Sequence, residues 1–246
     1  MNQLKLQLKT LKLSGINENL ELRLTEAQQN QLAYTELLTM LLNDEIETRN
    51  ARKLKRLIQS AGIRNDKTLE TFDFSFNPSI KAAQIRELAT CRFIERAEGI
   101  FFIGPTGTGK SHLANAICHQ ACRKYLRVAF YTFYDLFDEI NKAELKNQLS
   151  KFLRKLTHVD LLVIDDFAFK KIDQISAEYL YTIVDTRYQM KSTIITSNRA
   201  ISDWAAIFPD PIMANAILDR MAHNSYQIIM QGESYRKKFK PKLLNA

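Results

Sequence analysis

The sequence predicts an α/β fold in which helices cover both faces of a mostly parallel sheet. From residue 99 onward, short apolar runs alternate with helix-length segments, and parallel neighbours in a sheet need crossover connections of that length. The apolar runs are nearly continuous, which is typical of strands that are buried on both faces. The 246 residues suit one large domain, or one domain with a smaller appendage.

The N-terminal part is predicted to be a small helical domain over residues 1–64. Its first 60 residues contain no proline and a single glycine, and apolar side chains recur at helical spacing from Leu32 to Ile46. Residues 65–98 are expected to form a connecting arm followed by a helix from about Ile80 to Ala97. Glycine, asparagine and proline interrupt the helical spacing there before it resumes.

The α/β domain is expected over residues 99–246, with five strands separated by helices. Helices are expected after the first strand to about residue 124, over the charged stretch 134–156, and near 176–188 and 213–222. The runs that predict the strands are "IFFIG" (100–104), "RVAFYTF" (127–133), "DLLVIDDF" (160–167), "STIITSN" (192–198) and "YQIIM" (226–230).

A glycine-rich motif follows the first predicted strand and opens the next helix. The run "GPTGTGKS" matches the phosphate-loop pattern at every fixed position. Its glycines let backbone N–H groups converge on phosphate oxygens, and the positive end of the helix points at the same phosphates. Lys110 is expected to reach the β- and γ-phosphates of ATP, and the Ser111 hydroxyl to bind Mg²⁺. The expected nucleotide contacts are Gly104, Pro105, Thr106, Gly107, Thr108, Gly109, Lys110, Ser111 and His112.

Two adjacent carboxylates end the third predicted strand. A buried carboxylate is costly unless a partner meets it, and two neighbours also repel each other. In phosphate-loop NTPases an acid at this place holds Mg²⁺, so Asp165 is expected to bind the ion, partly through water. Asp166 is expected to orient and activate the attacking water. Because it is one methylene shorter than the usual glutamate, slow hydrolysis that a partner stimulates is predicted. A strand that simply ends in a solvated turn is the alternative.

Three further polar residues are candidates for the same site. Asn198 follows the fourth strand and is expected beside the γ-phosphate, with an ordinary asparagine turn as the alternative. Arg220 either pairs with Asp219 or inserts into the nucleotide site of a neighbouring subunit. Arg236 is either a second γ-phosphate contact or part of a basic surface that binds nucleic acid.

The formal net charge is +8, and the basic residues are clustered. The run "RNARKLKR" (49–56) holds five bases and no acid, and the tail "SYRKKFKPK" (234–242) holds five more. Such clusters favour a polyanion partner, with nucleic acid first, although a solvated helix face has the same composition. The first cluster gives the DNA-contact candidates Arg49, Arg52, Lys53, Lys55 and Arg56.

Composition argues against membrane insertion and against a disulfide framework. No apolar run approaches the roughly 18 residues of a membrane span, and the N-terminus lacks the apolar region of a secretory signal. A cytoplasmic location without a membrane partner is therefore expected. Cys91, Cys118 and Cys122 are too few for a disulfide framework, and they are expected to be buried packing residues rather than metal ligands.

Several segments together resemble the IstB family, AAA+ ATPases that help insertion-sequence transposases. These segments are "GPTGTGKSHLANAICHQAC", "LLVIDDF", "STIITSNR", "ILDRM…GESYR" and the arm "KTLETFDFSFNP". The resemblance extends more weakly to the DnaC helicase loaders. It implies an AAA+ phosphate-loop fold with a five-stranded parallel sheet of order 5-1-4-3-2. It also implies a truncated lid, since only residues 231–246 follow the last predicted strand.

The resemblance also implies roles for the polar residues. Residues 104–111 would be Walker A, and Asp165 with Asp166 Walker B. Asn198 would be sensor 1, Arg220 the intersubunit arginine finger and Arg236 a sensor 2-like residue. The family forms ATP-dependent oligomers on duplex DNA, with nucleotide at the subunit interfaces, and recruits or stimulates a transposase.

Relatives in the initiator clade carry an extra helical element that faces nucleic acid, between the second and third strands. Here that element would add the DNA-contact candidates Lys142, Lys146, Lys151, Arg154 and Lys155, with a solvated amphipathic helix as the alternative. A DnaC-like helicase loader is the alternative function, because the ATPase core is shared and the N-terminal helices choose the partner. The basic run 49–56 favours duplex DNA, bound through its phosphates rather than by sequence.

Overall fold

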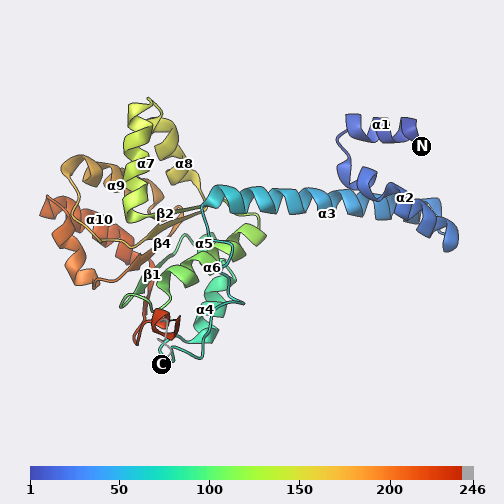
Figure 1. The fold of residues 1–246 in the computed structure, drawn as a ribbon. Coiled ribbons are helices and arrows are strands. Elements are labelled where there is room, and N and C mark those ends of the chain that lie inside the picture. Colours follow the sequence, from blue (N-terminus) through green and yellow to red (C-terminus); the bar gives the residue numbers. More distant parts are fainter. Residues whose placement is uncertain (240–246) are drawn as a thin grey trace, which may run out of the picture. The chain divides into compact units, whose positions relative to one another are not determined.

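The structure of the protein is a computed structural model that describes residues 1–239 (Figure 1). Contacts divide the chain into two compact units, Met1–Arg56 and Leu57–Ala246. Lys240 and Lys242 of the predicted basic tail lie outside the described residues. The elements of the first unit are the helices α1 (Asn2–Thr10) and α2 (Ser14–Gln29) and most of α3 (Tyr34–Ala61), which continues into the second unit.

The first unit is helical, as predicted, and its apolar core is small. Four side chains are buried in it: Leu8, Ile16, Leu20 and Leu41. Polar links supplement this core. Arg23 of α2 binds both carboxylate oxygens of Asp44 on α3, at 2.8 Å and 2.7 Å, a bidentate geometry that orients both side chains.

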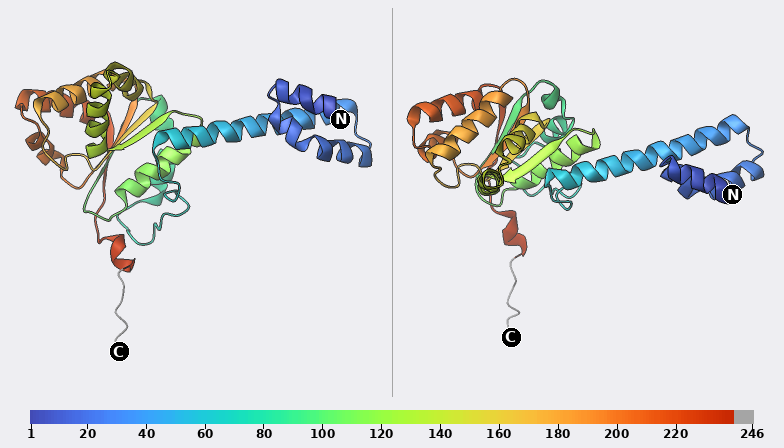
Figure 2. Two further views of the ribbon diagram at one scale, coloured as in Figure 1. Left: turned by 45° about the horizontal axis from the view of Figure 1, so that its top comes forward. Right: turned by 90° about the horizontal axis from the view of Figure 1, so that it is seen from above.

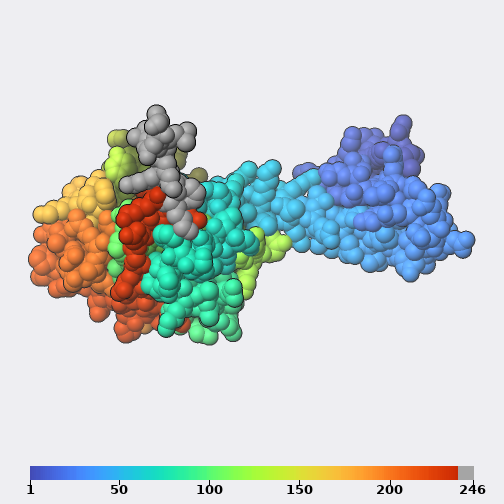
Figure 3. Space-filling model, turned by 60° about the horizontal axis from the view of Figure 1, so that its bottom comes forward, coloured from blue at the N-terminus to red at the C-terminus, as the bar shows by residue number. Residues whose placement is uncertain are grey.

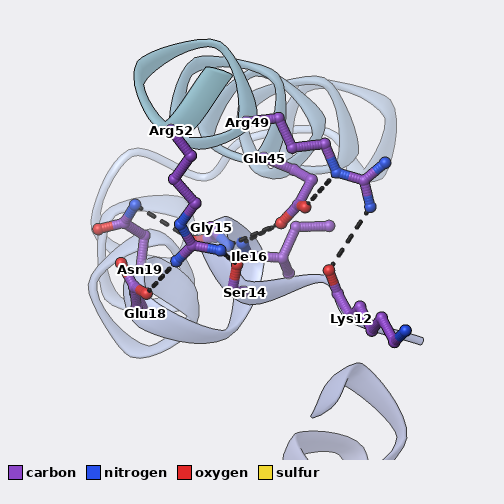
Figure 4. Close-up of polar contacts among 9 residues, drawn as sticks. All are labelled: Lys12, Ser14, Gly15, Ile16, Glu18, Asn19, Glu45, Arg49 and Arg52. Carbon is purple, nitrogen blue, oxygen red and sulfur yellow. Dashed lines mark hydrogen bonds and ion pairs between the residues drawn. The ribbon is translucent and has the colours of Figure 1, made fainter. Parts of the chain in front are cut away.

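A buried carboxylate caps α2 from the neighbouring helix (Figure 4). Glu45 of α3 accepts hydrogen bonds from the backbone N–H groups of Gly15 (2.6 Å) and Ile16 (3.3 Å). These donors lie in the first turn of α2, where no intrahelical acceptor is available, and no side chain at the N-cap of α2 binds them. A Cβ at Gly15 would lie 2.5 Å from the carbonyl oxygen of Asp44. The close approach of the two helices therefore requires glycine at this position.

Two arginines of the predicted basic run belong to the same junction (Figure 4). Arg49 donates to Glu45 at 2.7 Å. Arg52 pairs with Glu18 of α2 at 3.1 Å and also bonds the hydroxyl of Ser14. Arg52 therefore links α3 directly to α2, and Arg49 binds the carboxylate of its own helix that caps α2.

The second unit contains a five-stranded parallel sheet of order β2-β3-β4-β1-β5. This is the predicted order, read from the opposite edge. The three central strands are buried along almost their whole length, and the two edge strands only in part, which explains the continuous apolar runs. The strands are β1 (Gly99–Ile103), β2 (Val128–Thr132), β3 (Leu161–Asp165), β4 (Ser192–Ser197) and β5 (Ser225–Ile229).

Helices cover both faces of this sheet (Figures 1 and 2). One face packs into a large apolar core that includes Phe101, Leu162 and Ile195 from the strands and Trp204 from the connections. The helices on this face are α7 (Phe133–Leu145), α8 (Leu149–His158), α9 (Gln174–Arg187), the 3₁₀ helix η1 (Ile201–Ile207) and α10 (Pro211–His223). The opposite face carries α6 (Lys110–Arg123), with α4 (Ala82–Ala89) against it. The short α5 (Arg92–Glu95) precedes β1, and η2 (Tyr235–Phe239) follows β5.

Two predicted helices are each broken into two. The helix expected over 80–97 divides into α4 and α5 at Cys91, which has a left-handed φ of 60°. The stretch 134–156 divides into α7 and α8 near Asn147, which has a φ of 53°. Asparagine adopts this conformation more readily than most residues. The apolar spacing resumes after each break, so the helical pattern alone does not reveal it.

Two general properties of the described chain bear on function. Among residues 1–239, no helix is both long and apolar enough to cross a membrane. The thiols of Cys91, Cys118 and Cys122 are buried and unpaired.

We expect acid to loosen the junction between α2 and α3. Burial by itself would raise the pKa of Glu45, but hydrogen bonds from Arg49 and from the backbone of Ile16 and Gly15 lower it below 4.5. A carboxylate with a lowered folded pKa stabilises the fold above its unfolded pKa, and this contribution is lost as pH falls through the folded pKa. Hydrogen-exchange protection of α2 should therefore drop below pH 4.5.

Glu45→Gln is the matched variant for this measurement. It should show weaker protection of α2 already at neutral pH and a smaller further loss in acid, because the titrating group is gone. The same steep acid loss in the variant and the wild type would assign the effect to another carboxylate.

Candidate nucleotide-binding site

The glycine loop lies between β1 and α6, at the carboxyl edge of the sheet. Gly107 and Gly109 have φ values of 84° and 101°, a region that side chains with a Cβ rarely adopt. Gly109 is also the N-cap of α6. The loop therefore curls tightly and ends at the positive end of a helix, an arrangement that binds phosphate.

Lys110 is folded against this loop. Its ammonium group donates hydrogen bonds to the carbonyl oxygens of Gly104 and Pro105, both at 2.8 Å. Burial lowers the pKa of Lys110, the charges of Asp166 and Asp165 raise it, and the charge of Arg236 lowers it. The ammonium group therefore lies at the loop, within electrostatic reach of both predicted acids and of the C-terminal arginine.

Asp165 is the last residue of β3, and its carboxylate is buried. Burial raises the pKa of Asp165, while hydrogen bonds from the hydroxyls of Thr196 and Ser111 lower it. Asp166 is exposed and begins the turn after the strand, with a left-handed φ of 54°. The two adjacent acids thus differ: the first is buried and hydrogen-bonded, and the second is exposed.

The oxygen groups of Ser111 and Asp165 suit a Mg²⁺ ion that is bound by the protein and by phosphate together. Ser111 and Asp165 bring a hydroxyl and a carboxylate together, and Mg²⁺ prefers such oxygen ligands. Within the described residues, no three His, Cys, Asp or Glu side chains form a group that could hold a metal ion. Sites that hold Mg²⁺ with one or two protein ligands have phosphates and water complete the shell.

The segment after β5, residues 230–239 and called here the C-terminal segment, packs on the glycine loop. The backbone N–H of Tyr235 donates to the carbonyl of Gly107 at 2.9 Å, and Ser79 of the arm bonds the backbone of Gln231. In Figure 3 this segment, in red, runs beside the arm and α4, in teal. Arg236 belongs to the segment and is exposed. The charge of Arg236 lowers the pKa of Lys110, so Arg236 lies within electrostatic reach of the loop lysine, and its contact with the γ-phosphate stays a prediction.

Asn198 follows directly after β4, the strand between β3 and β1. It is exposed, at the same edge of the sheet as the loop and the acids. Parallel strands end at one edge, so this residue lies at the edge where Asp165 ends β3, and its position beside the γ-phosphate stays a prediction.

Arg220 lies on α10, and its side chain contacts residues of α9. Its guanidinium pairs with Asp185 at 3.0 Å and lies 5.4 Å from the ring centre of Tyr181. It also donates to the carbonyl of Ala216 in its own helix, at 2.8 Å. The local ion pair considered from the sequence was with Asp219, and the structure places Asp185 there.

The arm before the domain covers the start of α6, which sequence analysis did not predict. Nε2 of His112 lies 2.8 Å from the carbonyl oxygen of Thr68 and 3.2 Å from the hydroxyl of Thr71. The ring of Phe72 meets the His112 ring edge-on and packs against Gly109. The aromatic repeat "FDFSF" was the available signal. His112 therefore anchors the arm beside the loop.

The predicted DNA-contact residues fall into two groups. Arg49, Arg52 and Lys142 are engaged in ion pairs with acidic side chains, and Lys155 bonds the hydroxyl of Tyr131. Lys53 also has a partner. Among residues 1–239, Lys55, Arg56, Lys146, Lys151 and Arg154 form neither an ion pair nor a side-chain hydrogen bond, and all five are exposed.

Comparison with protein families finds a match over nearly the whole chain. The model of the IstB-like ATP binding protein family matches residues 6–243. The ATP-binding protein of insertion sequence IS5376 from Geobacillus stearothermophilus is 38% identical over 210 residues, covering 85% of this chain and 84% of that protein. The ATP-binding protein of IS21 from Pseudomonas aeruginosa is 36% identical over 242 residues, covering 98% and 91%.

Solved structures share the fold of the second unit. A DnaC helicase loader aligns with a TM-score of 0.55 at 23% identity, covering 68% of this chain and 98% of that chain. The replication initiator DnaA, bound to AMPPCP and single-stranded DNA, aligns with a TM-score of 0.57 at 21% identity, covering 72% and 54%. These similarities establish an AAA+ phosphate-loop fold.

Gly109→Ala is expected to weaken nucleotide binding. A left-handed alanine costs about 1–2 kcal/mol, and its Cβ would lie 2.7 Å from a ring carbon of Phe72. Relief of this strain must distort the loop, so affinity for a fluorescent ATP analogue should fall about tenfold or more. Gly232→Ala is the control, because its φ is also positive but its Cβ would meet Asn77 at an ordinary 3.6 Å. Equal losses in both variants would exclude the arm contact as the cause.

Proposed function

This chain belongs to the family of IstB-like ATP binding proteins, and from that premise we propose that it is a transposition ATPase. With ATP it assembles on duplex DNA in the cytoplasm and assists the transposase of an insertion sequence. The observation that carries the ATPase assignment is the meeting of Lys110, Ser111 and Asp165 at the glycine loop. The names of the relatives support the link to an insertion sequence.

In the proposed reaction, water attacks the γ-phosphorus of ATP and the bond to the β,γ-bridging oxygen breaks. Lys110 exchanges its two carbonyl contacts for the β- and γ-phosphates. Ser111 and Asp165 would hold Mg²⁺, which neutralises charge that develops on the phosphate oxygens. Asp166 orients the attacking water and takes its proton, and Asn198 binds beside the γ-phosphate. Arg236 contacts the same phosphate from the C-terminal segment.

Assembly would complete the site with a residue of the next subunit. We assign Arg220 to a neighbour's γ-phosphate, where an arginine stabilises the charge of the transition state. Within one chain its contacts are with α9 and α10. If the Arg220 guanidinium left the Asp185 carboxylate for a phosphate, it would still form charge-assisted hydrogen bonds to an anion.

We assign three functional parts to the chain. Residues 1–64 would be the domain that binds partners and DNA, residues 65–98 the arm that packs on the loop, and residues 99–246 the ATPase domain. Lys151 and Arg154 are exposed candidates for phosphate contacts on α8, and such contacts bind duplex DNA with little sequence preference.

Assembly on DNA tests the proposal directly. Light scattering and electron microscopy would compare duplex with single-stranded DNA, each with ATP, with ADP, and with Lys110→Ala. We expect ATP-dependent oligomers on duplex DNA that ADP and Lys110→Ala do not support. Arg220→Ala should still bind ATP but hydrolyse it slowly in the assembly. Assembly only on single strands, or only with a replicative helicase present, would replace this function with that of a helicase loader.

The response of DNA affinity to salt tests the basic face of α8. If Lys151 and Arg154 each neutralise a phosphate, the double alanine variant should weaken binding to all duplex sequences alike. It should also lower the slope of log affinity against log salt by about 2. Lys81→Ala, which removes an exposed lysine before α4, is the control and should keep the wild-type slope. An unchanged slope in the double variant would remove Lys151 and Arg154 from the DNA interface.

A further inference from the structure

The hydroxyl of Thr196 joins the two acids of the candidate site. Thr196 lies on β4 and is fully buried. Its hydroxyl donates a hydrogen bond to Oδ1 of Asp165 and accepts one from the backbone N–H of Asp166 at 3.0 Å. A hydroxyl has one donor and can accept as well, so a single group satisfies both neighbours at once.

The turn that carries Asp166 depends on this strand. Asp166 and Ala168 have φ values of 54° and 63°, which are unfavourable for residues with a Cβ. The carbonyl of Thr196 accepts from the N–H of Phe167 at 2.8 Å, and the hydroxyl of Ser197 donates to the carbonyl of Phe167 at 2.8 Å. β4 therefore holds the turn through both backbone and side chains.

We propose that Thr196 is a positioning residue for ATP hydrolysis. Its hydroxyl fixes the Asp165 carboxylate beside Ser111 for Mg²⁺ and fixes the backbone from which Asp166 reaches the attacking water. The inference rests on the proposed function and adds a residue outside the two acids. No other side chain among the described residues bonds both the carboxylate of Asp165 and the backbone of Asp166.

Two substitutions isolate the hydroxyl. Thr196→Ser and Thr196→Ala both remove the methyl group, and only the serine keeps the donor and acceptor. A group that orients a metal ligand typically changes metal affinity or activity about 10–100-fold when removed. We expect Thr196→Ala to lose that much in hydrolysis and in the Mg²⁺-dependent part of nucleotide affinity, and Thr196→Ser to keep most of both.

The measurement pairs hydrolysis with binding of a fluorescent ATP analogue, with Mg²⁺ and with EDTA. Binding in EDTA depends on Lys110 and the loop, so it should be the same for the alanine and serine variants. Thr193→Val is the matched control, because this threonine lies on the same strand and binds Arg187 at 3.2 Å, away from the two acids. Thr193→Val should hydrolyse ATP at the wild-type rate, even if the loss of its contact with Arg187 lowers the melting temperature.

Two outcomes would overturn the role of the Thr196 hydroxyl. Equal activity and equal Mg²⁺ dependence in the serine and alanine variants would overturn the role of the hydroxyl. A loss of binding in EDTA as large as the loss with Mg²⁺ would show a general structural defect and would overturn it as well. A wild-type chain that binds Mg²⁺ and ATP but does not hydrolyse ATP even when it is assembled on duplex DNA would instead contradict the proposed function. The comparison of Mg²⁺-dependent binding would still test Thr196 in that case.

Discussion

The parallel arrangement of β1, β4 and β3 is the constraint on which the nucleotide site depends. Parallel strands end at a common edge, so segments far apart in the sequence meet where these three strands end. The glycine loop leaves β1, Asp165 ends β3 and Asn198 follows β4. The buried apolar side chains between the sheet and its helices fix this edge, and the polar groups need only short connections to reach one another.

The two units are stabilised by different interactions. The second unit has an extensive apolar core between sheet and helices, which gives it a rigid platform for chemistry. The first unit has four buried apolar side chains and relies on Glu45, Asp44 and their arginine partners. A small core contributes little hydrophobic free energy, so buried and bidentate polar contacts are a larger share of what holds these helices together.

The sequence was sufficient for the sheet order, the glycine loop and the family, and each is confirmed. The strands follow from apolar periodicity and the glycine loop from a motif whose residues are adjacent in the chain, whereas the sheet order was implied by the resemblance to the family. The breaks at Cys91 and Asn147 were not predicted, because one left-handed residue leaves the apolar spacing on either side intact.

Contacts between residues that are far apart in the sequence could not be predicted from the sequence either. Phe72 against Gly109 and Thr196 between two acids depend on tertiary packing. The charge pattern 49–56 did not distinguish Arg49 and Arg52, which pair with acidic side chains, from Lys55 and Arg56, which form no ion pair in the described structure.

The buried cysteines make this chain suitable for site-specific spectroscopic labelling. Burial raises the pKa of Cys91 and of Cys122 to about 11, and raises that of Cys118 as well. Thiolate is the reactive form, so at neutral pH the native thiols should react slowly with maleimide or with spin labels. One cysteine introduced on an exposed face of each unit would then carry the probes, with no need to replace native residues. Distances between such probes, measured with and without nucleotide, would report how the helical unit and the second unit are arranged.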